Sequence, residues 1–306
     1  MAAPGSAGVT ERSTVTLPGM PTVDPLVARK TWRTVEPFHG VIYFAPEAAE
    51  RYAALGIDDR AGYFASRSAA MGPVGADVVI ATFFNFNPDL VRGAVPGVWQ
   101  TATPDKVLAA RLDAADAVLR RVLGDAVAGG EMARAAELAR VAAEAACEHL
   151  EGRPLFAAHA GLDWPDQAHL VLWHAQTLLR EYRGDGHVAA LTASGLSGIE
   201  ALVVHAATGE VPAEALKATR AWTDEGWAAG VDSVRARGWL ADGDELRLSE
   251  AGAAHRQGVE DTTDRLAVDA YRALGDDGCS ELRGLTRPFS QAIVSSGSFG
   301  FATGRN

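Results

Sequence analysis

The sequence contains little cysteine, and its cysteines form no pattern. Only Cys147 and Cys279 occur in 306 residues, and neither lies in a CxxC or a Cys/His finger spacing. Two distant cysteines cannot supply the disulfide framework of a small secreted protein, which favours a reducing, cytoplasmic compartment. A structural zinc site is not expected either, because it needs clustered Cys and His ligands.

Membrane-spanning and targeting segments are also lacking. No uninterrupted apolar stretch reaches the roughly 18 residues that a membrane helix requires. The first 24 residues lack the basic and apolar regions of a secretory signal. They are rich in Ala, Pro, Gly, Ser and Thr, so we expect residues 1–24 to form a flexible arm. We therefore expect a soluble protein without a membrane partner.

Positive charge is scarce as well. There are 28 Lys and Arg residues against 39 Asp and Glu residues, so the formal net charge is −11. This balance does not forbid nucleic-acid binding, but it removes the broad basic surface that phosphate neutralisation usually needs.

Helical periodicity is abundant. Ala, Leu, Arg and Glu recur at helical spacing and alternating strands are scarce, which predicts a mainly all-α fold. Asn87-Pro88 and Thr103-Pro104 are typical helix starts, with a capping side chain followed by proline. The apolar run Val78–Phe86 fits either a buried helix or a short strand.

The length suits two modules, since domains commonly hold about 100–150 residues. Glycines and prolines follow one another quickly between Leu150 and Pro165, so we place the boundary there. We expect a helical module over residues 25–150 and a second module over residues 151–306.

The segment Arg183-Gly-Asp-Gly186 predicts a turn within the second module. A helix would end at Tyr182 and another would begin at His187, because two glycines weaken a helix. Asp185 is then either the N-cap of the second helix or a functional carboxylate, and the sequence leaves both open.

Residues 211–274 carry the pattern of a winged helix. A helix at 212–220 is followed by a helix capped by Thr223 that runs into Arg-Gly-Trp-Leu240. An acidic turn at 241–245 would join short strands at 238–240 and 245–248, before a long helix at 253–274. This order, with the pair "RGWL…LSEAG", resembles the MarR-type transcription factors. The resemblance implies a winged helix-turn-helix with a small two-stranded wing.

A wider resemblance covers nearly the whole chain. It rests on Glu36-Pro-Phe-His39, on Thr82-Phe-Phe-Asn85-Phe86, on Leu172-Trp-His174 and on the segment 179–191. Together these motifs resemble a family of uncharacterised actinobacterial helix-turn-helix proteins. That resemblance implies a fold, but it assigns no activity.

The predicted recognition helix, residues 224–238, is poorly suited to DNA. It carries three acids against two bases, Arg235 and Arg237, and the bases lie at its C-terminal end, away from the groove-entering N-terminus. The predicted wing is acidic too. We therefore do not expect DNA as a partner, and a regulator whose Lys217, Arg235 and Arg237 touch phosphates stays open as an alternative.

Several histidines point to acid–base chemistry, because an imidazole near neutrality can move a proton without a cofactor. The predicted catalytic residues are His39, His174 and His187, oriented by Glu181 or Asp185. An apolar cleft between the modules would bind a small molecule. Its predicted ligand-binding residues are Phe38, Tyr43, Phe84, Asn85, Trp173, Arg183 and His205. Each histidine or aromatic residue also has a plain interpretation as a satisfied core residue.

These features favour a small-molecule-binding protein on a repurposed winged-helix scaffold, with cofactor-independent catalysis in specialised metabolism as an extension. The alternatives are a ligand-responsive MarR-like regulator and a haem- or metal-binding protein with a histidine ligand. The sequence names no cofactor, and it leaves open both a monomer and a homodimer.

Overall fold

A computed structural model describes residues 22–299 of the chain. All but the last three residues of the predicted flexible arm, 1–24, lie outside this range. Within it the chain is built from α-helices and short 3-10 turns, and no β-strand is assigned. The predicted all-α class is therefore confirmed.

Nine α-helices precede α10 (Ala168–Ala193), the central helix of the structure. The apolar run is helical from Val78 to Phe83, which decides between the two predicted alternatives for that part, while residues 84–86 lie outside the helix. The nine are α1 (Pro25–Gly40), α2 (Pro46–Ala54), α3 (Asp59–Ser68), α4 (Ala76–Phe83), α5 (Pro88–Ala94), α6 (Val98–Thr101), α7 (Pro104–Leu123), α8 (Gly130–Cys147) and α9 (Pro154–Ala160).

Seven helices make up the remainder of the described chain. They are α10 (Ala168–Ala193), α11 (Gly198–Ala206), α12 (Ala213–Arg220), α13 (Asp224–Ala236), α14 (Glu250–Ala267), α15 (Asp269–Arg272) and α16 (Gly275–Ser295). No single helix among residues 22–299 is long and apolar enough to cross a membrane, although α10 and α11, bent by 99°, pass the length and composition test as a pair.

Helix starts lie where capping chemistry places them. The Asn87 side chain accepts a hydrogen bond from the Asp89 amide, and Thr223 accepts one from Gly226. Thr103 precedes α7 as expected, yet its side chain makes no capping bond. Ser197 and Glu200 form a reciprocal capping box at α11, which satisfies two amides that a helix start leaves free.

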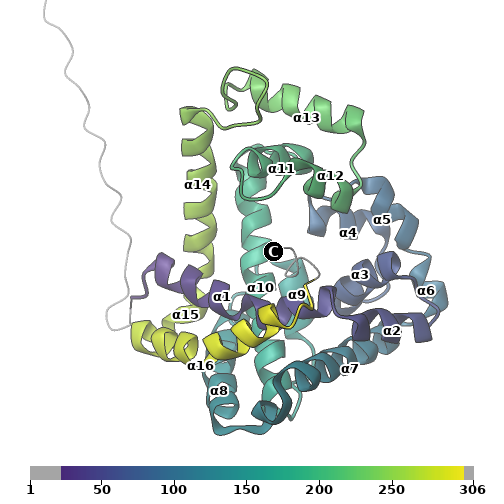
Figure 1. Ribbon diagram of the computed structural model, residues 1–306, viewed down its shortest axis with the longest axis vertical. Helices are drawn as coiled ribbons and strands as arrows, with labels where there is room; N and C mark the ends of the chain where they lie inside the picture. Colours follow the sequence, from purple (N-terminus) through teal and green to yellow (C-terminus); the bar gives the residue numbers. More distant parts are fainter. Residues whose placement is uncertain (1–21, 300–306) are drawn as a thin grey trace, which may run out of the picture.

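Helix α10 runs through the middle of the structure, and α14 packs beside it (Figure 1). One half of α10 lies in a body formed by α1 to α9 with α15 and α16, whose residues share one hydrophobic core. Its other half carries α11, and α12 and α13 lie at that same end of the view. We call α11 to α14, with the hairpin between α13 and α14, the helix-turn-helix unit. Two long helices thus connect this unit to the body.

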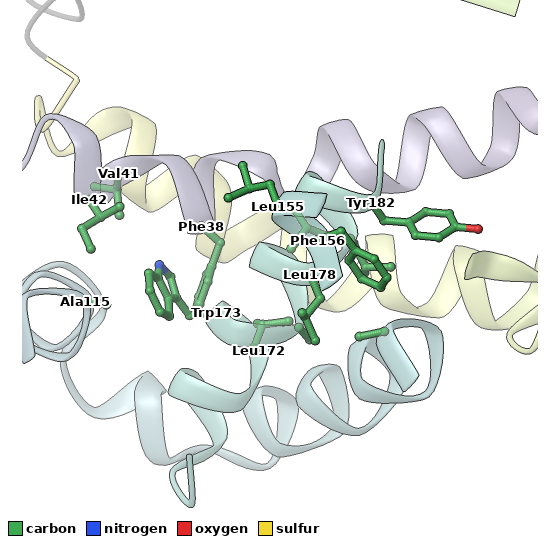
Figure 2. Packing of buried hydrophobic residues seen from close by; sticks show 14 of the residues in the cluster. Phe38, Val41, Ile42, Ala115, Leu155, Phe156, Leu172, Trp173, Leu178 and Tyr182 are labelled. Carbon is green, nitrogen blue, oxygen red and sulfur yellow. The ribbon is translucent and has the colours of Figure 1, made fainter. Parts of the chain in front are cut away.

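The larger hydrophobic core lies in the body. It draws on residues before position 150 and on residues after it, among them Phe38 and Leu172, both fully buried. Figure 2 shows Phe38, Trp173 and Leu178 among the buried side chains of this cluster. A second cluster, which includes Leu191, Val204 and Val259, holds the helix-turn-helix unit together. The division of the chain near residue 150 stays a prediction.

The predicted turn at residues 183–186 is wrong, because α10 is continuous from Ala168 to Ala193. A Cβ at Gly186 would lie 3.3 Å from the Leu266 Cβ of α14, so the glycine permits close helix packing. This packing offsets the roughly 1 kcal/mol that each glycine costs inside a helix. Asp185 caps no helix of its own; its carboxylate accepts a hydrogen bond from the Phe156 amide of α9, at 2.9 Å.

The predicted two-stranded wing is also wrong. The hairpin forms a single antiparallel bridge between Leu240 and Leu248. The Ala241 amide donates to the Arg247 carbonyl and the Ser249 amide to the Trp239 carbonyl, both at 2.9 Å, and no further ladder bond joins the two segments in the described structure. The Leu248 amide points away from this pair and donates to the carbonyl of Ala207, the C-cap residue of α11, at 3.3 Å. The predicted long helix at 253–274 is interrupted as well: α14 ends at Ala267 and α15 follows.

Gly198 marks a close approach between the body and the helix-turn-helix unit. A Cβ there would lie 2.1 Å from the Phe84 carbonyl oxygen. We expect Gly198→Ala to lower the free energy of unfolding by about 2 kcal/mol or more, because two backbones would have to separate. Urea unfolding followed by circular dichroism measures this change.

Gly258→Ala is the matched control. Gly258 lies within α14 with no atom within 4 Å of an added Cβ. This variant should gain up to about 1 kcal/mol from helix propensity alone. Equal effects of the two substitutions would contradict the close packing of Phe84 on α11.

Candidate functional site

A cleft of about 560 Å³ lies where the body meets the helix-turn-helix unit. Its lining comes from α1, α3, the end of α4, α10, α12 and α14. Because these helices belong to both parts of the chain, the cleft exists only when the two are packed together. We call this hollow the arginine cleft, after the residues described next.

Arginine dominates the lining of the cleft. Seven arginines and four carboxylates contribute to it, although the whole chain carries a net charge of −11. The arginines are Arg29, Arg33, Arg67, Arg180, Arg183, Arg220 and Arg256, and the carboxylates are Glu181, Asp185, Glu210 and Glu260. The cleft thus reverses the sign of the chain's overall charge.

Glu181 organises the inner wall. Its carboxylate oxygens each accept a hydrogen bond from Arg67, both at 3.2 Å, and one accepts another from Arg180 at 2.9 Å. Burial alone would raise the pKa of Glu181, but Arg67 and Arg180 lower it to about 2. The carboxylate is therefore ionised at neutral pH, and it holds two guanidinium groups at the cleft.

The α1–α10–α14 side of the cleft has its own ion pairs. Asp264 pairs with Arg29 at 3.1 Å and with Arg183 at 2.8 Å. Glu260 pairs with Arg256 at 2.9 Å and also with Arg29. Five of the seven arginines, these three with Arg67 and Arg180, therefore have a carboxylate partner.

Arg33 and Arg220 form no ion pair with any residue from 22 to 299, but Arg33 is exposed whereas Arg220 is partly buried. Arg220 donates to the Thr219 hydroxyl, and its guanidinium carbon lies 5.1 Å from the centre of the Phe86 ring. Its Nε is buried without a hydrogen-bond partner in the described structure. Burial and the nearby Arg67 both lower its pKa. A half-buried cation without a counter-ion costs free energy unless an anion joins it.

Phe84 and Asn85 lie at the junction of α4 with the cleft. Phe84 has φ 58° and ψ −53°, and the Asn85 amide donates to the Phe83 carbonyl at 2.6 Å. These values define a γ-turn, which is rare and strained for a residue with a side chain. The Asn85 carbonyl accepts from the Trp222 indole at 2.9 Å, so the turn is fixed to α12 and α13.

His187 presents an imidazole nitrogen without a partner. The Thr263 hydroxyl donates to the Val259 carbonyl at 2.8 Å, so its oxygen accepts from Nδ1–H of His187 at 2.9 Å. The neutral ring then carries its lone pair on Nε2, which no described residue contacts by a hydrogen bond. Burial lowers the pKa of His187 and Glu260 opposes this effect, so the ring is neutral at pH 7.

His39 is satisfied within the core. It is fully buried and stacked on Trp173, at 5.7 Å between ring centres. Thr177 donates to the Trp173 carbonyl, so it accepts from His39 Nδ1–H, while the Tyr43 hydroxyl donates to Nε2. Burial and nearby arginines hold its pKa well below the usual range. With both nitrogens engaged, His39 does not reach the cleft.

The structure brings together only some of the predicted residues. Phe84, Asn85, Glu181, Arg183, Asp185 and His187 line the arginine cleft. His205 lies in a smaller hollow that adjoins it. The predicted residues that do not line either hollow are His39, His174, Phe38, Tyr43 and Trp173. His174 packs edge-on against Trp164, and burial lowers its pKa to about 4.

Sequence reasoning missed most of the arginines. Arg67 lies 114 residues from Glu181 in the sequence, and no spacing rule joins them. Arg29 and Arg33 share a helix face at i, i+4, a weak signal that a basic surface would also give. Arg220 belongs to no motif in the sequence, and only the structure shows that it lines the cleft.

Metal and haem binding have few candidate ligands here. Among residues 22–299, no three His, Cys, Asp or Glu side chains converge as metal ligands. For an axial haem ligand a histidine needs a free nitrogen, which His187 has and His39 lacks.

The fold and the cleft define an all-α protein with a helix-turn-helix unit packed on a helical body. The chain belongs to a Helix-turn-helix family, whose model matches residues 28–300. Neither the curated proteins nor the solved structures contain a match to this chain.

Asp185 gives the site a testable pH dependence. Burial raises its pKa from 3.8 to about 6, against the hydrogen bond from Phe156. The folded protein therefore binds a proton that the unfolded chain has released, and stability falls as pH rises from about 4 to about 6. We expect Asp185→Asn to be more stable than wild type at pH 7.5 by on the order of 2 kcal/mol, with no gain at pH 4.

Urea unfolding of both proteins at the two pH values measures the difference. Asp185→Ala is the control, because it loses the acceptor for the Phe156 amide and should be less stable than Asp185→Asn at both. An Asn variant less stable than wild type at pH 7.5 would contradict the raised pKa.

Proposed function

We propose that this protein binds a small organic anion in the arginine cleft. The observation that carries the proposal is Arg220, a half-buried guanidinium with no carboxylate partner among the described residues, in a lining where arginines outnumber acids. An anionic group bound between Arg220 and Arg67 would satisfy the unpartnered Nε and relieve the repulsion between the two cations.

The size and walls of the cleft support a small molecule. Ligand sites commonly measure about 300–1,000 Å³ and combine apolar walls with a few polar groups. Here Trp32, Tyr63, Phe83 and Phe86 supply aromatic surface beside the guanidinium groups. A planar anion would therefore contact both rings and charges.

His187 is our candidate for proton transfer within this proposal. Its Nε2 lone pair is free and its tautomer is fixed by Thr263, the arrangement that a general base needs. Asn85 lines the same part of the cleft and could orient a carbonyl or hydroxyl of the ligand. Acid–base catalysis on the bound anion, without a cofactor, is the enzymatic form of the proposal.

A ligand-responsive, MarR-like regulator is the second candidate. Family membership and the exposed α13 helix favour it. However, the basic residues that would contact DNA already have carboxylate partners. Lys217 pairs with Asp224 at 2.7 Å, and Arg237 pairs with Glu200 at 3.0 Å. Contact with phosphates would have to break these pairs, so we rank DNA binding below ligand binding.

The variant Arg220→Gln tests the proposed anion site. The probes are 8-anilinonaphthalene-1-sulfonate and N-phenyl-1-naphthylamine, which has the same rings without the sulfonate. We expect the variant to bind the sulfonate about 10- to 100-fold more weakly, because it loses a charge-assisted hydrogen bond. Its affinity for the uncharged probe should not change. Fluorescence titration measures both affinities.

Arg92→Gln is the matched control for charge. Arg92 lies on α5 outside the cleft and pairs with exposed Asp77. It should bind both probes as wild type does. Sulfonate binding that survives Arg220→Gln, or that weakens equally in both variants, would rule out the cleft as the anion site.

The regulator alternative has its own experiment. In a mobility-shift assay with the duplex upstream of the protein's own gene, at moderate salt, we expect no specific retardation. A salt-sensitive, sequence-specific shift that Lys217→Gln abolishes would overturn our ranking of the two functions.

A further inference from the structure

The arginine cleft continues into a second hollow of about 210 Å³, which we call the apolar branch. Five residues line both hollows, so the two are contiguous: Asn85, His187, Leu191, Arg256 and Glu260. The branch extends from this polar junction toward the core of the helix-turn-helix unit.

Beyond the junction the walls of the branch are mainly aliphatic. Leu196, Leu202, Val204 and Val259 are each buried to better than nine-tenths and come from α11, from α14 and from the residues just before α11. His205 is the polar exception, and its Nδ1 lies 3.5 Å from Arg256. A hollow with such walls gains free energy when an apolar group replaces water in it.

The two hollows therefore differ in the chemistry they accept. The cleft offers guanidinium groups, the branch offers aliphatic side chains, and Asn85 and His187 lie where they meet. We infer that the ligand is an amphipathic organic acid whose anionic head binds the cleft arginines and whose hydrocarbon part enters the branch. This inference rests on the proposed function and specifies its substrate class.

The size of the branch limits the hydrocarbon part. Its volume corresponds to roughly seven water-sized groups, so a short or medium-length chain, or one ring, fills it. The position of His187 then places its free Nε2 beside the atoms that join the head to the hydrocarbon. A functional group on those atoms would be the one that exchanges a proton with the protein.

A series of straight-chain carboxylates tests the inference by titration calorimetry. Butanoate, hexanoate, octanoate and decanoate supply increasing hydrocarbon length, and inorganic phosphate supplies an anion without any. We expect affinity to rise about three- to fourfold per methylene until the branch is full, and then to level off.

Two variants alter the branch and one serves as a control. Ala201→Leu narrows it and should lower octanoate affinity while butanoate binds as before. Val204→Thr keeps the shape, adds a hydroxyl and should weaken octanoate binding at least about fivefold. Ala228→Leu is the same alanine-to-leucine change on the exposed face of α13, and it should leave the affinities for octanoate and butanoate unchanged. Unchanged phosphate binding shows that each variant is folded.

The outcomes separate this inference from the function on which it rests. If phosphate and all carboxylates bind with similar affinity through Arg220, the anion site stands and the apolar branch is not used. If carboxylate affinity rises with chain length but octanoate affinity is the same in wild type and in both branch variants, the hydrocarbon lies elsewhere and the inference is wrong. If no anion binds at all, the proposed function and the inference both fail.

Discussion

The cleft depends on one buried carboxylate, Glu181. It is almost inaccessible to solvent, yet it stays ionised because Arg67 and Arg180 surround it. Removing water from a charge costs several kcal/mol, and only close partners offset that cost. Glu181 thereby anchors α3 to α10, and Glu36 on α1 holds the other side of Arg180 at 2.8 Å. With these arginines fixed, Arg220 enters a wall that is already cationic.

The outer and inner sides of the helix-turn-helix unit also differ in whether their basic side chains have carboxylate partners. On its outer side Asp224 and Asp232 are exposed by 84% and 80% of their side chains, and the nearby bases pair with carboxylates. On its inner side α12 contributes an unpaired arginine and α14 contributes Arg256 to the cleft. A helix-turn-helix fold is thus combined with cations that face an internal cleft.

Much of the helical framework was predictable, because local chemistry determines it. Proline after a capping residue placed the starts of α5 and α7, and Thr223 placed the start of α13. Local rules failed where tertiary packing prevailed. Two glycines should have broken α10, but α14 packs against Gly186 and the helix continues. The predicted wing is reduced to the single bridge between Leu240 and Leu248.

The candidate site was predictable only in part. His39 and His187 are the same residue type in similar helical contexts, and only the fold shows that Tyr43 occupies the free nitrogen of one and nothing described occupies the other. The cleft arginines come from five helices, and no sequence spacing relates one helix's arginines to another's.

A crystal structure of the protein with 8-anilinonaphthalene-1-sulfonate would test the central claim most directly. Our account predicts the sulfonate within hydrogen-bonding distance, about 2.7–3.2 Å, of the guanidinium groups of Arg220 and Arg67. A sulfonate bound outside the cleft, with Arg220 turned to a carboxylate or to bulk solvent, would contradict it.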